Sequence, residues 1–110
     1  MKLLIGSLLV VSLLLMGCGG PSSLSGYDDL AKCLTAAGVK MYGANWCSHC
    51  QNQKAAFGDS FEKINYVECT KEQEACAAAG IEGLPTWVID GQKYPGEQKL
   101  DRLAELADCS

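Results

Sequence analysis

The hydrophobic positions of this chain follow a helical spacing in four segments. The first segment starts after Asp28 and Asp29, either of which can cap a helix, and stops at Gly38. Its apolar positions, spaced i, i+3, i+4 and i+7, are Leu30, Cys33, Leu34 and Ala37. The other predicted helices run from about residue 47 to 57, from residue 71 to 79 after a Thr70 cap, and along the stripe of Leu100, Leu103, Leu106 and Ala107.

Short apolar runs between these segments predict strands. They cover residues 39–42, 64–69, 86–89 and 92–94. The last two runs are joined by Asp90-Gly91, a dipeptide that favours the left-handed turn of a tight hairpin. The predicted order is therefore helix, strand, helix, strand, helix, strand, strand, helix, which is the order of an α/β fold with a mixed central sheet flanked by helices.

The first 26 residues have a different character. Residues 1–17 form a predicted signal peptide, because the apolar run from Leu3 to Met16 is shorter than the roughly 20 residues that span a bilayer. Leu15-Met16-Gly17-Cys18 resembles a bacterial lipobox, which implies a lipid on Cys18 and cleavage before it. The alternatives are an ordinary signal peptide or an uncleaved anchor. We expect a flexible linker over 18–26 and a single folded domain over 27–110, lipid-anchored to the cell membrane on its extracytoplasmic side.

The charge balance excludes one group of partners. The 110 residues carry 9 basic and 13 acidic side chains, a net charge of −4, and no basic cluster. An acidic domain of this kind is not built to bind nucleic acid or anionic lipid surfaces. We expect a monomer whose membrane attachment depends on acyl chains alone.

The most informative motif is a pair of cysteines two residues apart, in Trp46-Cys47-Ser48-His49-Cys50. Two thiols on the first turn of a helix can form a disulfide and reopen without movement of the backbone. The helix N-terminus also stabilises a thiolate at the first cysteine. Together with Gly83-Leu84-Pro85-Thr86 before a later strand, the motif is characteristic of thioredoxin-like redox proteins. The predicted element order is that of a thioredoxin fold that lacks its first strand.

A closer resemblance covers nearly all of residues 28 to 107. The segments that carry it are 41–50, Gln51 with Gln53 and Lys54, 57–58, 66–69, 78–81, 83–87 and 91–92. They resemble the thioredoxin-like domain fused to bacterial and plant homologues of vitamin K epoxide reductase. The resemblance implies a domain that relays electrons from substrate thiols to the membrane enzyme, which passes them to a quinone. Ser48 departs from the family's usual proline.

The chemistry of the motif predicts distinct roles for its residues. Cys47, nearer the helix terminus, attacks and carries the mixed disulfide, and Cys50 resolves it. A cationic His49 beside them stabilises the thiolate, or else is an exposed polar residue without such a role. Trp46 shields the disulfide or is a core aromatic.

The resemblance also implies a role for the Leu84-Pro85 segment. If Pro85 is cis, as its superfamily counterpart is, the backbone around it lies beside Cys47 and can pair with a substrate peptide. The alternative is a plain loop break. Reducing thioredoxins carry a buried carboxylate six residues before the first cysteine, and this position is Met41 here.

The remaining cysteines indicate an oxidising compartment. Of seven, Cys18 is assigned to lipid, and an even number remains for pairing in an exported domain. We predict bridges between Cys69 and Cys76 and between Cys33 and Cys109, out of 15 possible connectivities. Buried free thiols are the alternative.

Three classes of function follow. The first is an envelope thiol–disulfide oxidoreductase that oxidises substrate protein thiols and is re-oxidised by a vitamin K epoxide reductase-like membrane protein, with no cofactor besides its redox-active disulfide. Its variant is an envelope reductase for cytochrome maturation or disulfide repair. The second is a metal-binding protein that uses Cys47, His49 and Cys50, which lacks a complete ligand set. The third is a binding module with an inert disulfide.

Overall fold

The computed structural model describes residues 26–110. The predicted signal peptide, the Cys18 lipid site and the linker up to residue 25 lie outside the described residues. The described elements are α1 (Asp28–Ala36), β1 (Lys40–Gly43), α2 (Ser48–Phe57), the 3₁₀ helix η2 (Gly58–Lys63), β2 (Tyr66–Glu68), α3 (Gln73–Ala78), β3 (Thr86–Ile89), β4 (Gln92–Pro95) and α4 (Leu100–Leu106). This is the predicted order, with η2 added.

The four strands form one mixed sheet in the order β2-β1-β3-β4. β1 pairs parallel with β2, and it pairs antiparallel with β3, which in turn pairs antiparallel with β4. One row of side chains crosses the whole sheet in register: Tyr66, Met41, Trp87 and Tyr94. The predicted α/β fold with a mixed sheet between helices is therefore confirmed.

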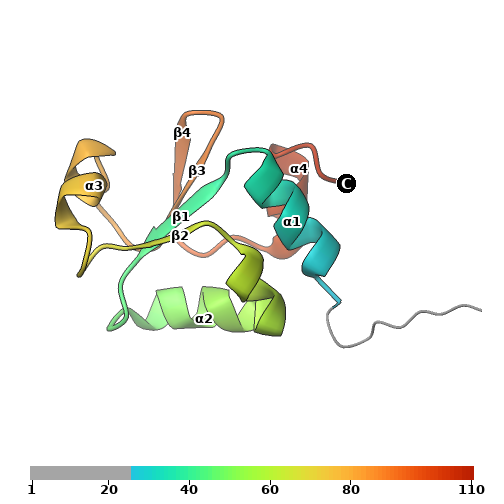
Figure 1. Ribbon diagram of the computed structural model, residues 1–110, viewed down its shortest axis with the longest axis horizontal. Coiled ribbons are helices and arrows are strands. Elements are labelled where there is room, and N and C mark those ends of the chain that lie inside the picture. Colours follow the sequence, from blue (N-terminus) through green and yellow to red (C-terminus); the bar gives the residue numbers. More distant parts are fainter. Residues whose placement is uncertain (1–25) are drawn as a thin grey trace, which may run out of the picture.

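The two faces of the sheet are covered unequally. The main core lies on the face of that row, where α1, α2 and α4 contribute Leu34, Phe57 and Leu103. A smaller cluster on the opposite face joins Val67 of β2 to Cys76 of α3. In Figure 1, α3 accordingly stands apart from α1, α2 and α4. The redox helix α2 thus rests on the larger core, which fixes its position against the sheet.

The hairpin and the helix ends show where local signals were sufficient. Asp90 and Gly91 have φ values of 51° and 77°, the left-handed pair that the Asp-Gly turn predicts. Gly38 and Gly58 follow α1 and α2 with positive φ values, as helix-ending glycines do.

Two predicted helix caps are wrong. α1 begins at Asp28 itself, with Tyr27 at its N-cap and no side-chain capping bond from Tyr27. The Asp28 carboxylate accepts a 2.6 Å hydrogen bond from Ser60 Oγ. α3 begins at Gln73 rather than Lys71, because Thr70 donates its hydroxyl to Glu68 at 2.7 Å. In both cases the side chain that was expected at a helix end bonds another side chain, 32 positions away for Asp28 and two positions away for Thr70.

Two disulfides join elements at opposite sides of the domain. Cys33 of α1 is bonded to Cys109 after α4, across 76 residues. Cys69 after β2 is bonded to Cys76 of α3, across 7 residues. Cys47 and Cys50 are the free cysteines of the described chain.

Candidate active site

The two free thiols lie at the beginning of α2. Cys47 is the N-cap residue, and its Sγ accepts a 3.2 Å hydrogen bond from the backbone N–H of Cys50. This bond places the first sulfur against the unpaired N–H groups of the helix terminus, where negative charge is stabilised. Cys47 is 6% exposed and Cys50 is fully buried. An incoming thiol or disulfide therefore meets Cys47 first.

The loop before β3 closes the other side of Cys47. The Leu84–Pro85 peptide bond is cis, and the Cys47 thiol lies 3.7 Å from the Leu84 carbonyl oxygen, to which it donates. Thr86 donates its hydroxyl to the Gly83 carbonyl at 2.6 Å and so ties the loop to itself. The structure thus brings Cys47 next to the Leu84–Pro85 peptide, which begins 37 positions later in the sequence.

Trp46 lies at the rim of the site and is 71% exposed. It is therefore not a core aromatic. Its ring is open to solvent at the position directly before Cys47.

The His49 side chain contacts the segment between β4 and α4. Its Nδ1 lies 2.6 Å from Glu97 Oε2, and Asn52 Nδ2 donates to the same oxygen at 3.3 Å. These hydrogen bonds from His49 and Asn52 hold the pKa of Glu97 below its ordinary value. Glu97 therefore carries a negative charge at neutral pH that offsets a charge on His49, and the stabilisation of the Cys47 thiolate by His49 stays a prediction.

The second thiol is held in its protonated form. Burial, followed by the hydrogen bond with Cys47, raises the pKa of Cys50 to about 12. At neutral pH Cys50 is consequently a thiol, and it becomes a nucleophile only when its proton is removed. This difference in burial supports the division of roles that the sequence predicts.

Gln53 is a buried residue of this region that the sequence analysis did not identify as structural. It is 1% exposed on α2. Its Oε1 accepts hydrogen bonds from Trp87 Nε1 at 3.0 Å and from the Gln98 backbone at 2.7 Å, and its Nε2 donates to the Gln98 carbonyl at 3.0 Å. All of these polar atoms are thereby satisfied, and α2 is fixed to β3 and to the loop before α4.

Glu68 is a second residue whose structural role was not predicted from the sequence. Its carboxylate accepts hydrogen bonds from the backbone N–H groups of Asn45 and Thr70 and from the hydroxyls of Thr70 and Tyr66. The bond to Asn45 ties the end of β2 to the segment just before Cys47. Tyr66 and Glu68 are two positions apart on a strand and so face the same side, a signal that the sequence does contain.

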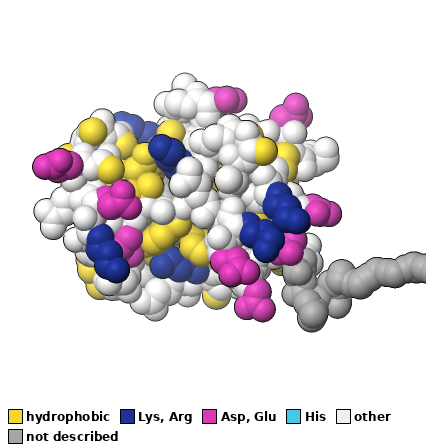
Figure 2. Space-filling view, viewed as in Figure 1, with side chains coloured by type: hydrophobic (Ala, Val, Ile, Leu, Met, Phe, Trp, Pro, Cys, Tyr) yellow, Lys and Arg dark blue, Asp and Glu magenta, His cyan; other side chains and the backbone are white. Residues whose placement is uncertain are grey.

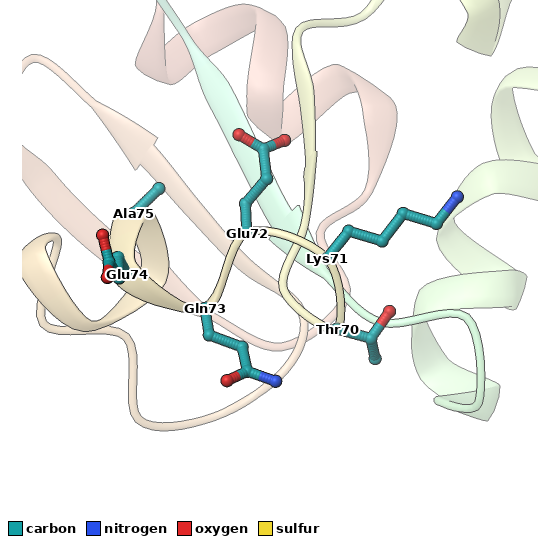
Figure 3. A pocket seen from close by; sticks show the side chains of 6 residues that line it. All are labelled: Thr70, Lys71, Glu72, Gln73, Glu74 and Ala75. Carbon is teal, nitrogen blue, oxygen red and sulfur yellow. The ribbon is translucent and has the colours of Figure 1, made fainter.

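The best-formed pocket elsewhere on the described residues does not gather reactive side chains. The pocket in Figure 3 is lined by Thr70 to Ala75, and the six side chains fan outward rather than converge. Within residues 26–110, no three His, Cys, Asp or Glu side chains form a group that could hold a metal ion. Acidic and basic side chains are interspersed on the face in Figure 2. No helix in the described part of the chain is long and apolar enough to cross a membrane.

The fold and the dithiol define the class, and comparison with known proteins gives the family. The chain belongs to the thioredoxin family, whose model matches residues 29–108. It is similar to "Thiol-disulfide oxidoreductase LTO1" of Arabidopsis thaliana, with 49% identity in an alignment of 90 residues that covers 74% of this chain. It is also similar to "Thioredoxin domain-containing protein 5 homolog" of Drosophila melanogaster, with 32% identity in an alignment of 78 residues that covers 59% of this chain.

These matches cover most of this chain but only a small part of each relative. The chain spans 24% of the Arabidopsis protein and 18% of the Drosophila protein. The solved structure of Fasciola hepatica thioredoxin matches with a TM-score of 0.47 and 18% identity, over 66% of this chain and 79% of that one. The thioredoxin family and the Cys47/Cys50 dithiol together make this chain a thiol–disulfide oxidoreductase.

Proposed function

We propose that this chain oxidises thiols of substrate proteins in the cell envelope and is then re-oxidised by a vitamin K epoxide reductase-like membrane protein. The observation that carries the proposal is the placement of two sulfurs at a helix N-terminus, with Cys47, the more exposed of the two at 6%, against the Leu84–Pro85 loop and Cys50 fully buried. No metal and no organic cofactor are needed, since the electrons move through the two sulfurs.

The proposed cycle has two halves. A substrate thiolate attacks Sγ of Cys47 in the Cys47–Cys50 disulfide, and Cys50 leaves with the electron pair of the broken bond. A second substrate thiolate then attacks the mixed disulfide, so the substrate gains a disulfide and the chain holds two thiols. In the second half, the partner's disulfide is attacked by Cys47, and Cys50 displaces the partner's sulfur. Two electrons have then passed from substrate to partner.

Two observations support the oxidising direction. Met41, fully buried in the middle of the sheet, stands where reducing thioredoxins are expected to carry a carboxylate. Two disulfides other than the active pair are formed, which suits an oxidising compartment. The Arabidopsis relative, 49% identical over the aligned region, is named a thiol–disulfide oxidoreductase, which supports thiol–disulfide exchange in either direction.

The proposed location follows from the first 26 residues. A signal peptide over 1–17 and a lipid on Cys18 would place the domain on the outer side of the membrane. A linker of 8 residues between Cys18 and Tyr27 extends to at most about 26 Å at roughly 3.3 Å per residue. A tether this short suits a redox partner in the same membrane.

The redox state of Cys47 and Cys50 in living cells tests the direction of electron flow. Cells that make the full chain are quenched with acid and alkylated, and the modified cysteines are mapped by mass spectrometry. We expect the pair to be mostly oxidised at steady state, and to become reduced when quinone-linked re-oxidation is blocked. A sample reduced with dithiothreitol before alkylation marks the fully reduced signal. A pair that is mostly reduced in untreated cells would contradict the proposal and indicate a reductase.

A further inference from the structure

The buried thiol of Cys50 needs a route for its proton. Cys50 is fully buried, and in the mixed disulfide the neighbouring Cys47 sulfur is bonded to the partner and cannot accept a proton. The strand position beside it, where a buried carboxylate would serve, holds Met41. The residues that do approach Cys50 from β2 are therefore of interest.

Gly43 creates a space that Cys50 and Tyr66 share. A Cβ at Gly43 would lie 3.1 Å from Cys50 Sγ, 3.1 Å from Tyr66 Oη and 3.0 Å from Tyr66 Cε1. Both polar atoms therefore lie 3.1 Å from one point, so they are at most twice 3.1 Å apart. This separation allows direct contact or one bridging water molecule. A Cβ at position 43 would therefore crowd both side chains, which would have to shift by a few tenths of an ångström.

The Tyr66 hydroxyl is oriented by Glu68. Tyr66 donates to Glu68 Oε1 at 2.8 Å, which leaves the lone pairs of its oxygen available to accept a proton. Tyr66 and Glu68 are both half-buried. Sulfur, hydroxyl and carboxylate thus form a line from the fully buried Cys50 to the protein surface.

We propose that Tyr66 and Glu68 carry the Cys50 proton to solvent during the resolving step. The inference rests on the proposed function, since it concerns the second half of the exchange. The Cys50 sulfur forms a bond with Cys47 Sγ, the bond between Cys47 and the partner breaks, and its electron pair leaves on the partner's sulfur. The Cys50 proton passes to Tyr66 Oη as the Tyr66 proton passes to Glu68, which releases it to water. Atoms and charge balance without any further reactant.

The charges around Cys50, Tyr66 and Glu68 are consistent with proton transfer from Cys50 toward Glu68. The ionisable groups that face Cys50 are Cys47 and Lys54 on its own helix and Tyr66 on β2. Lys54 Nζ lies 4.1 Å from the centre of the Tyr66 ring, and its charge favours the Cys50 thiolate. Burial and the bond to Glu68 raise the pKa of Tyr66, so the hydroxyl stays protonated and acts as a relay rather than a base.

Glu68 is suited to be the acceptor at the outer end. Burial raises the pKa of this carboxyl, but hydrogen bonds from Thr70, Tyr66 and Asn45 outweigh that effect and leave it below its ordinary value. Glu68 is consequently ionised at neutral pH, so it can accept a proton transiently and lose it readily to solvent.

The test separates the two thiol steps in one experiment. Stopped-flow mixing of the reduced full chain with dithio-bis-nitrobenzoate releases one coloured thiol when Cys47 attacks and a second when Cys50 resolves. For Tyr66→Phe we expect an unchanged first release and a second release slowed on the order of 10²-fold, the low end of the range for general acid–base catalysis. The deficit should be largest at low pH and should narrow as hydroxide becomes available. Glu68→Gln, which keeps an acceptor for Tyr66 but removes the charge, should slow the same step.

Tyr94→Phe is the matched control. Tyr94 lies in the same cross-sheet row, packs against the core and is half-buried, but is on the far strand from Cys50. Loss of the Tyr94 hydroxyl should leave the rates of both thiol releases unchanged. Equal second releases in Tyr66→Phe and the unmodified chain, across pH, would overturn the relay and leave the redox function standing. Release of only one thiol by the unmodified chain would overturn both.

Discussion

Replacement of Cys47 by serine is expected to abolish thiol–disulfide exchange, with a loss on the order of 10³-fold or more in the rate of substrate oxidation. Cys47 is the sulfur at the helix N-terminus, and the one the solvent reaches. A serine oxygen cannot form a disulfide with Cys50 or with a substrate thiol. Cys50 cannot replace Cys47 as the attacked sulfur, because it is fully buried. The rate is measured as the formation of disulfides in a reduced substrate protein by the oxidised full chain.

Cys50→Ser is the matched variant for this experiment. It keeps the attacking sulfur and removes the resolving one, so we expect long-lived mixed disulfides between Cys47 and substrate proteins, visible on non-reducing gels. Adducts that form through Cys50 in Cys47→Ser as readily as through Cys47 in Cys50→Ser would reverse the assigned roles. The absence of adducts in both variants would indicate an inert disulfide in a binding module.

The second large effect concerns the disulfide between α1 and the C-terminal end. Cys33→Ala with Cys109→Ala is expected to lower the free energy of unfolding by about 4 to 5 kcal/mol, because this bond closes a loop of 76 residues in the unfolded chain. For Cys69→Ala with Cys76→Ala the same chain-entropy relation gives about 2 kcal/mol, because the loop there has 7 residues. Urea unfolding with the Cys47–Cys50 pair kept in one redox state measures both losses.

The two double variants act as controls for each other. Each removes one disulfide and leaves two alanines, so a difference between them reports loop length and local packing rather than chemistry. A smaller loss for the Cys33/Cys109 variant than for the Cys69/Cys76 variant would contradict the chain-entropy explanation. It would mean that packing of α1 against α4 alone holds that end of the domain.

Local signals in the sequence were enough to predict most of the fold. Helical spacing after Asp28, the Asp90-Gly91 turn and the glycines that end helices each specify a conformation within a few residues of chain. The redox motif is also local, since Cys47 and Cys50 belong to one helical turn. Only the thioredoxin-like pattern as a whole related Pro85 to that turn.

The rest of the site depends on contacts between distant segments. Glu97 meets His49 across 48 positions, and Gln53 meets Gln98 across 45. In the sequence, each of these polar residues looks like an ordinary surface residue. Thr70 is a different case, because its partner Glu68 lies only two positions away. The expected cap at Asp28 belongs with these distant contacts, because the Asp28 carboxylate binds Ser60 across 32 positions. Such partners are chosen by tertiary packing, which hydrophobic periodicity does not specify.

Gly43 illustrates a third kind of information. In the sequence it is a small residue at the end of a strand, with no distinctive neighbour. In the structure its missing Cβ is the space in which Cys50 Sγ and the Tyr66 ring approach each other. A close approach of this kind follows only from the register that places Tyr66 beside Met41.

The reduction potential of the Cys47–Cys50 pair tests the central claim most directly. The full chain is equilibrated with buffers of reduced and oxidised glutathione, and the fraction of oxidised pair is determined by alkylation. Our account predicts a two-electron transition at this pair, with the other two disulfides intact and a potential of about −120 to −180 mV, the range of disulfide donors and isomerases. A value near −270 mV, the potential of thioredoxin, would contradict the oxidising role. A pair that never equilibrates with glutathione would contradict redox activity altogether.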